Sequence, residues 1–184
     1  METENLKQIK ENLKDLLTNI DKNIDSLYEI ATHDEKTGLY NYKFFSEMLK
    51  IELEKAKRGG KLSIAIFDID HFKALNTKLG HIKADEILKQ VANILERSLR
   101  KSDIIARFGG EEFIALLPNT GKAKAKMVAE RLRRIIFNRL KLSGITISSG
   151  ITEYKSKDTV KKIKERADKA LFKAKEKRNR VEVL

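Results

Sequence analysis

The chain has 184 residues, of which 41% are hydrophobic, and a formal net charge of +12. This length and composition fit one domain of ordinary size with an appendage, and the absence of cysteine excludes disulfides and thiolate metal sites. The sequence contains neither a run of about 18 apolar residues that could span a membrane nor a secretory signal, so we expect a cytoplasmic protein.

The positive charge is concentrated in the body of the chain. Residues 1–33 hold four lysines and seven acidic residues, whereas residues 122–141 and 155–180 are dominated by lysine and arginine. Such an excess favours polyanionic partners, which include nucleic acid, anionic lipid and nucleoside phosphates. No aromatic stacking platform and no familiar nucleic-acid-binding motif accompanies the lysines, so we expect no nucleic-acid partner.

Residues 1–33 are predicted to form one helix with a narrow apolar stripe. Apolar residues recur at alternating spacings of three and four, which is typical of a coiled-coil seam, and a single polar residue interrupts them. A lone helix cannot bury such a stripe, so we expect a second copy of the chain to cover it. The alternative is packing against the body of the same chain. The seam consists of Leu6, Ile9, Leu13, Leu16, Ile20, Asn23, Leu27 and Ile30.

The remaining residues, 34–184, show alternating helix and strand signals. Apolar residues spaced for a buried helical face predict helices over 44–57, 87–99, 127–136 and 160–174. Short apolar runs predict strands at 62–70, 103–108, 112–117, 144–154 and 181–184. Gly109 and Gly110 separate the second and third of these strands, and two glycines at this point favour a tight hairpin.

This order contains the β-α-β-β-α-β arrangement of ferredoxin-like folds. We therefore expect an α+β sandwich, with a ferredoxin-like or palm-like sheet that is partly antiparallel, flanking helices and a preceding coiled-coil helix. In the usual strand order of this fold the first strand lies antiparallel beside the third. That pairing would bring Asp68 and Asp70, at the end of the first strand, next to Glu111 and Glu112 at the start of the third.

Four carboxylates at one sheet edge repel each other unless a cation neutralises them or some are protonated. Carboxylate oxygens suit Mg²⁺ or Mn²⁺, and Mg²⁺ usually completes its coordination with substrate phosphates. We therefore interpret the two hairpin glutamates as metal ligands. For the hairpin taken alone, a solvated turn would be the simpler interpretation.

The stretch RFGGEEF (107–113) resembles the signature of the GGDEF family, the diguanylate cyclases, in its GGEEF variant. Three other segments resemble further motifs of the family in the same order. They are DEKTGLYN (34–41), FDIDHFKALNTKLGHIKAD (67–85) and RADKALFKAKEKRNRV (166–181). The resemblance covers residues 34–184 and implies a catalytic domain there. From their apolar seam, we expect residues 1–33 to be a dimerising and signalling helix.

The resemblance implies a domain that binds one GTP and acts as a homodimer, in which each 3′-hydroxyl attacks the α-phosphate of the opposite GTP. The products would be cyclic di-GMP and two pyrophosphates. By position, Asp68 and Glu111 would hold Mg²⁺ (or Mn²⁺), helped by the Ile69 carbonyl. Glu112 would be a further ligand or would help to deprotonate the 3′-hydroxyl. The terminal phosphates would be contacted by Phe72, Lys73, Lys175 and Arg178.

The resemblance also assigns the guanine base to Asn76 and Asp85. A carboxylate only accepts hydrogen bonds, so Asp85 matches the N1–H and N2–H₂ donors of guanine, whereas adenine presents an acceptor at N1. An exposed helix N-cap is the alternative role for Asp85. Gly110 would leave room for the substrate against the hairpin backbone. Lys36 stands where the family commonly has leucine.

The tetrapeptide RKSD (100–103) resembles the inhibitory RxxD site of the family, which binds cyclic di-GMP. Arg100 would contact a guanine edge or a phosphate, Asp103 would accept from N–H groups, and Arg131 on the next helix would add a second arginine. A competing hypothesis is a catalytically weak GGDEF domain that serves as a receptor for cyclic di-GMP or GTP. The intact acidic residues favour an active, product-inhibited enzyme.

Overall fold

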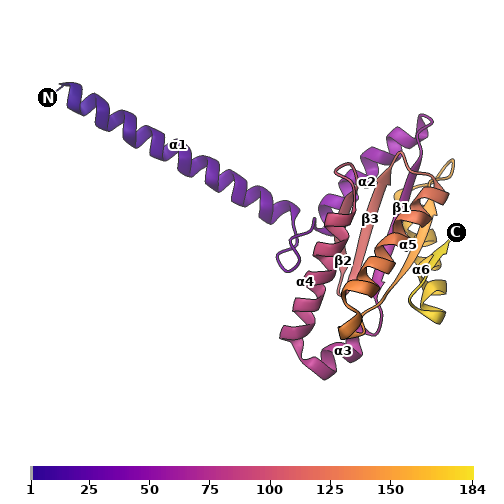
Figure 1. Cartoon of the computed structure of the whole chain (residues 1–184). Helices are drawn as coiled ribbons and strands as arrows, with labels where there is room; N and C mark the ends of the chain where they lie inside the picture. Colours follow the sequence, from indigo (N-terminus) through magenta and orange to yellow (C-terminus); the bar gives the residue numbers. More distant parts are fainter. Residues whose placement is uncertain (1) are drawn as a thin grey trace.

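The computed structural model describes residues 2–184, with side chains from residue 5 onward, as a long helix attached to an α/β body (Figure 1). The helices are α1 (Glu2–Thr32), α2 (Tyr42–Lys57), α3 (Phe72–Leu79), α4 (His81–Ser98), α5 (Lys122–Arg139) and α6 (Val160–Lys177). The strands are β1 (Leu62–Ile69), β2 (Ile104–Gly109), β3 (Glu112–Pro118), β4 (Ile147–Glu153) and β5 (Val181–Val183). A short 3-10 helix, η1 (Lys141–Ser143), precedes β4.

The body is built on one five-stranded sheet with the order β2-β3-β1-β4-β5. Strand β1 pairs antiparallel with both β3 and β4, and β4 pairs parallel with β5. This order confirms the expected α+β class and the expected pairing of the first strand with the third. Because β1 lies at the centre, all eight of its residues are buried, which explains its nearly continuous apolar sequence.

Helices cover both faces of the sheet, and the alternation of side chains along β1 supplies both cores. Ala65 and Phe67 belong to the core that α4 and α5 cover. Ile64 and Ile66 belong to the opposite core, which α2 and α6 cover. The acidic end of β1 is therefore held between two packed layers, and its position depends on both.

Helix α1 projects away from the body, and its apolar stripe is not covered by the rest of the chain (Figure 1). Ile9 is 64% exposed and Ile30 is 77% exposed. The alternative in which the body of the same chain buries this stripe is therefore wrong. Over the part of the chain that the structure describes, no helix has the length and apolar character needed to cross a membrane.

Two local features differ from the sequence-based expectation. Helix α3 was not expected, because it has only eight residues, none of them buried, and gives no helical periodicity. It begins two residues after the end of β1, and its N-cap residue His71 adopts a left-handed conformation with φ 59°. In α5, the apolar face predicted over 127–136 begins with Met127, but Met127 is 71% exposed, and the small residues Ala125 and Ala129 are buried instead.

Gly150 on β4 sets the distance between the sheet and α6. A Cβ atom added there would lie 2.0 Å from the Leu171 nitrogen and 2.3 Å from the Ala167 oxygen, both in the helix backbone. We predict that Gly150→Ala lowers the free energy of unfolding by about 3 kcal/mol, because helix or strand must shift to relieve the clash. Urea denaturation measures this.

Gly60→Ala is the matched control, because its added Cβ would approach backbone no closer than 3.4 Å. Equal stability of the two variants would contradict this account of how α6 packs on β4.

Candidate active site

Acidic residues from two distant segments lie side by side at the end of the central strand pair. Asp68 of β1 is directly opposite Glu112 of β3, and the Ile69 nitrogen donates to the Glu111 carbonyl oxygen at 3.4 Å. This register keeps alternate residues of β1 and β3 in the same core, with Phe67 and Phe113 on one face of the sheet and Ile66 and Ile114 on the other. A one-residue slip would move every side chain of a strand to the opposite core. The predicted juxtaposition of the two segments is confirmed.

Asp68 is a buried acidic side chain at the end of β1. It is 3% exposed, and its carboxylate forms an ion pair with Lys175 of α6. Burial raises the pKa of Asp68 above its usual value, Lys175 opposes this, and the charges of Glu111 and Asp70 add to it. The ionised form of Asp68 is thus only partly compensated by the protein.

Glu112 experiences a similar environment. Its half-buried position raises the pKa of its carboxyl group, the negative charge of Asp68 raises it further, and Lys175 lowers it. The charge of Lys175 therefore acts on two carboxylates, the buried Asp68 and the half-buried Glu112, with Glu111 close by. A bound cation would favour the ionised forms of Asp68 and Glu112, which is the electrostatic condition for a metal site.

Asp70 does not join this cluster as a free carboxylate, which corrects the expectation of four converging acids. Its two oxygens accept hydrogen bonds from Thr146 Oγ1 at 2.6 Å, Ser148 Oγ at 2.7 Å and the Asn179 nitrogen at 2.9 Å. Asp70 instead ties the end of β1 to β4 and to the segment that follows α6. It holds the site together rather than lining it.

The donor set fits a metal that substrate helps to bind. Among the residues that the structure describes, no three acidic or histidine side chains are arranged to hold an ion by themselves. Mg²⁺, however, is commonly bound by one or two carboxylates together with substrate phosphates and waters. The carboxylates of Asp68 and Glu112, paired across the two strands, meet that smaller requirement.

The amino end of α3 follows the end of β1 after two residues, Asp70 and His71. The N-cap residue His71 makes no side-chain capping bond, so the first N–H groups of the helix, which belong to Phe72 and Lys73, are not occupied by a side-chain cap. Such N–H groups, with the helix dipole, favour phosphate.

Lys175 reaches the cluster as expected, although here it pairs with Asp68. Arg178 lies exposed at the C-cap of α6.

The two residues assigned to the base lie on consecutive packed helices, Asn76 on α3 and Asp85 on α4. The Oδ1 atom of Asn76 is buried and, among the described residues, has no hydrogen-bond partner. An unsatisfied buried acceptor is costly, so a ligand donor at this position would be favourable. Asp85 is the fifth residue of α4 and not its N-cap, which is Gly80, so the alternative N-cap role is wrong.

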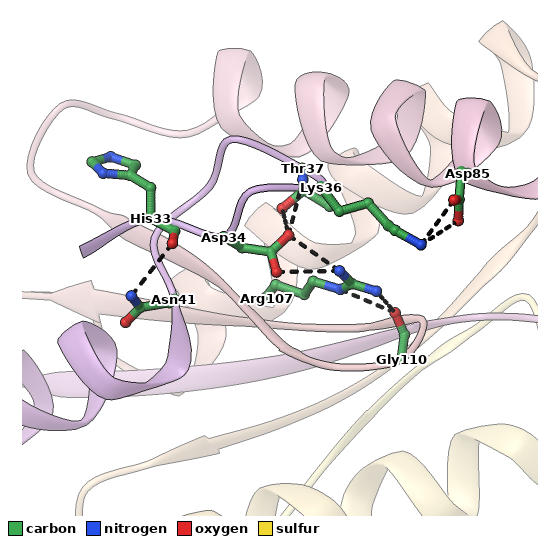
Figure 2. Close-up of polar contacts among 8 residues, drawn as sticks. All are labelled: His33, Asp34, Lys36, Thr37, Asn41, Asp85, Arg107 and Gly110. Carbon is green, nitrogen blue, oxygen red and sulfur yellow. Dashed lines mark hydrogen bonds and ion pairs between the residues drawn. The ribbon is translucent and has the colours of Figure 1, made fainter. Parts of the chain in front are cut away.

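Sequence reasoning missed Arg107, which connects the hairpin to the segment after α1 (Figure 2). Its guanidinium donates to the Gly110 carbonyl at 2.8 and 3.1 Å and to both Asp34 oxygens at 3.2 Å. Asp34 also accepts from the nitrogen and the hydroxyl of Thr37. The sequence pattern that could have identified it is an arginine two residues before a glycine pair. Carbonyl groups in a tight turn lack partners in the strands and need hydrogen-bond donors, which an arginine can supply.

The residues of the RxxD motif lie away from the acidic cluster, on the connection between α4 and β2. The Asp103 carboxylate accepts from the Arg100 backbone nitrogen at 3.0 Å, which closes the turn. Arg100 and Arg131 line one cavity of about 410 Å³ together with residues of α5. Arg131 also donates to the Ser98 carbonyl at 2.6 Å, which fixes it near the end of α4.

Comparison with known proteins gives a consistent set of relatives. The family described as "Diguanylate cyclase, GGDEF domain" matches residues 31–180. The diguanylate cyclase DgcP of Pseudomonas aeruginosa is 44% identical over 83% of this chain, and diguanylate cyclase A of Treponema denticola is 39% identical over 95% of it. The matched regions cover only 24% and 50% of those two proteins, so the chain spans at most about half their length.

A solved structure of the coiled coil and GGDEF domain of DgcB from Caulobacter crescentus, in complex with c-di-GMP, has a TM-score of 0.85 and 27% identity. The superposition covers 97% of this chain and 99% of that one. The likeness therefore includes the projecting helix α1 as well as the α/β body.

We predict that Asp34→Asn lowers the free energy of unfolding by about 1.5 kcal/mol at neutral pH, because it weakens the link to Arg107. Burial raises the pKa of Asp34, but the bonds from Thr37 and the Arg107 charge outweigh it and leave the pKa below its usual value. A lowered pKa means that the stabilisation is present above about pH 4 and is lost as the pH falls through the folded value.

Urea unfolding at neutral pH and near pH 3 measures this difference, with the exposed neighbour variant Glu35→Gln as control. A loss of the same size at both pH values would show that Asp34 does not act through its charge.

Proposed function

The chain belongs to the GGDEF family of diguanylate cyclase domains, and we propose from this that it condenses two molecules of GTP into cyclic di-GMP and two pyrophosphates. The observation that carries the proposal is the register of β1 and β3, with Asp68 opposite Glu112 and Ile69 bonded to Glu111. A triphosphate bound at the amino end of α3 would place its charge beside these acids, where a divalent cation can join the two.

Asp68 and Glu111, with the Ile69 carbonyl, would hold Mg²⁺ or Mn²⁺ at this point. When bound, the metal would polarise the α-phosphate and stabilise charge on the attacking and leaving oxygens. The chain's own residues orient the triphosphate. The N–H groups of Phe72 and Lys73 and the ammonium of Lys175 bind its phosphate oxygens. Lys175 exchanges its bond to Asp68 for one to the substrate.

Each half of the reaction forms a bond between a 3′-oxygen and the opposite α-phosphorus and breaks the bond to the leaving pyrophosphate. The 3′-hydroxyl must lose a proton in this step. Glu112 suits that role, because its carboxylate belongs to the first residue of β3, directly opposite Asp68 and next to the proposed metal site. Gly110 keeps the hairpin clear of a side chain next to the reacting groups.

Because one site holds one GTP, the reaction requires two domains face to face. The exposed seam of α1 supports a homodimer in which residues 1–33 form a coiled coil and residues 34–184 form the catalytic domain. The coiled coil would raise the effective concentration of the second active site. We place this activity in the cytoplasm, where GTP is available.

We further propose that cyclic di-GMP inhibits the enzyme at the RxxD site. Arg100 and Arg131 offer two guanidinium groups to one cavity, and guanidinium groups suit bidentate contacts with phosphates and guanine edges. Asp103 would accept from base N–H groups. The site is built from the connection between α4 and β2 and from α5, segments distinct from those that hold the acidic cluster.

Glu111→Gln is predicted to lower the rate of cyclic di-GMP formation by about a thousandfold, because it removes a ligand charge from the metal site with little change of shape. Chromatography of the nucleotides after incubation with GTP and Mg²⁺ measures the product. Glu86→Gln is the control, since Glu86 is an exposed residue of α4. Full activity of Glu111→Gln would contradict the proposed site.

Arg100→Ala is predicted to leave the initial rate unchanged and to raise the final yield of cyclic di-GMP several-fold, because product no longer stops the reaction. Complete progress curves measure both quantities. Lys101→Ala removes an exposed neighbouring charge and should behave like the parent chain. If the reaction of Arg100→Ala stopped at the same concentration of cyclic di-GMP as that of the parent chain, the inhibitory site would have to lie elsewhere. The assignment as a diguanylate cyclase would not be affected.

A further inference from the structure

Lys36 makes a direct contact with the residue assigned to the base. Its Nζ atom lies 2.8 Å from both carboxylate oxygens of Asp85, so the ammonium is centred on the edge of the carboxylate (Figure 2). The two residues are 49 positions apart in the sequence and come from the segment after α1 and from α4. Together they line a cavity of about 470 Å³.

The backbone around Lys36 is held in place on both sides, which distinguishes this contact from a chance surface ion pair. Asp34 is fixed by Arg107, and the nitrogen and hydroxyl of Thr37 both donate to Asp34. The Leu39 carbonyl accepts from the Asp34 nitrogen at 2.7 Å, and Leu39 is buried. The loop therefore directs the lysine stem toward Asp85, and only the stem itself remains free to move.

The position of this ammonium has a consequence for guanine, given the proposed function on which the argument rests. Guanine presents N1–H and N2–H₂ donors to a carboxylate, and both oxygens that would accept them are occupied by Lys36. The base must displace the ammonium from the carboxylate edge. The guanine atom next to N1–H on the same edge is O6, an acceptor, so the displaced ammonium has a partner within a short movement of its stem.

We propose that Lys36 is a specificity-determining residue of the guanine site, whose ammonium donates to O6 while Asp85 accepts from N1–H and N2–H₂. Adenine would present an amino group to the ammonium and a bare N1 to the carboxylate, so both contacts would reject it. Displacement costs little, because both side chains of the pair are partly exposed and such pairs contribute little net stability.

The proposal is tested by equilibrium binding of GDP and 6-thio-GDP in the presence of Mg²⁺. Neither nucleotide has a pyrophosphate leaving group, so neither can condense. The thio analogue keeps the N1–H and N2–H₂ donors and replaces O6 by a weaker acceptor. The parent chain should bind GDP about tenfold more tightly than 6-thio-GDP, and Lys36→Met should reduce this preference to about twofold or less.

Lys83→Met is the matched control, because it removes the same charge from an exposed residue of α4. Lys83 precedes Asp85 by two residues and so lies on roughly the opposite side of the helix. Lys83→Met should keep the full preference for GDP over 6-thio-GDP. If Lys36→Met kept the preference, or simply bound both nucleotides more tightly, Lys36 would be only a competitor for Asp85 and the proposal would be overturned.

Turnover of GTP by the parent chain separates this inference from the proposed function. Nucleotide binding with a Lys36-dependent preference but without cyclic di-GMP formation would refute the cyclase activity and leave the role of Lys36 intact. Cyclic di-GMP formation with a preference that Lys36→Met does not change would refute the role of Lys36 alone.

Discussion

The antiparallel pairing of β1 with β3 is the constraint on which the site depends. It places Asp68 against Glu112 and close to Glu111, although more than forty residues of chain separate the two segments. The apolar parts of both strands are buried on both faces of the sheet, so their packing holds the acidic ends together despite the repulsion between them. Burial and this repulsion raise the pKa values of Asp68 and Glu112. A cation shared with a polyanionic substrate would neutralise these carboxylates. The repulsion between them would then be replaced by attraction to the bound cation.

The segment between α1 and α2 joins three parts of the molecule. Asp34 contacts Arg107, which holds the Gly110 carbonyl of the hairpin, and Lys36 contacts Asp85 on α4. Asn41 caps α2 through the Phe44 nitrogen and donates to the Ala31 carbonyl at the end of α1. The segment therefore connects the end of α1 with the hairpin and with Asp85 of α4 through short, directional contacts.

The sequence predicted the layered fold and the acidic centre because both depend on strong, local signals. The apolar run 62–70 and the glycine pair at 109–110 identify β1 and the hairpin, and strand order then brings their acids together. Contacts made by single side chains across long separations left no such signal. The bonds of Asp70 to Thr146 and Ser148, and the link between Lys36 and Asp85, follow from tertiary packing rather than from any periodicity.

The most direct test of the shared-cation account is a crystal structure of the chain with Mn²⁺ and a GTP analogue that cannot release pyrophosphate. We predict an anomalous peak at about 2.1 Å from carboxylate oxygens of Asp68 and Glu111. The same ion should contact the triphosphate, with Lys175 released from Asp68. A metal ion bound by the triphosphate alone, with Asp68 still paired to Lys175, would contradict the account.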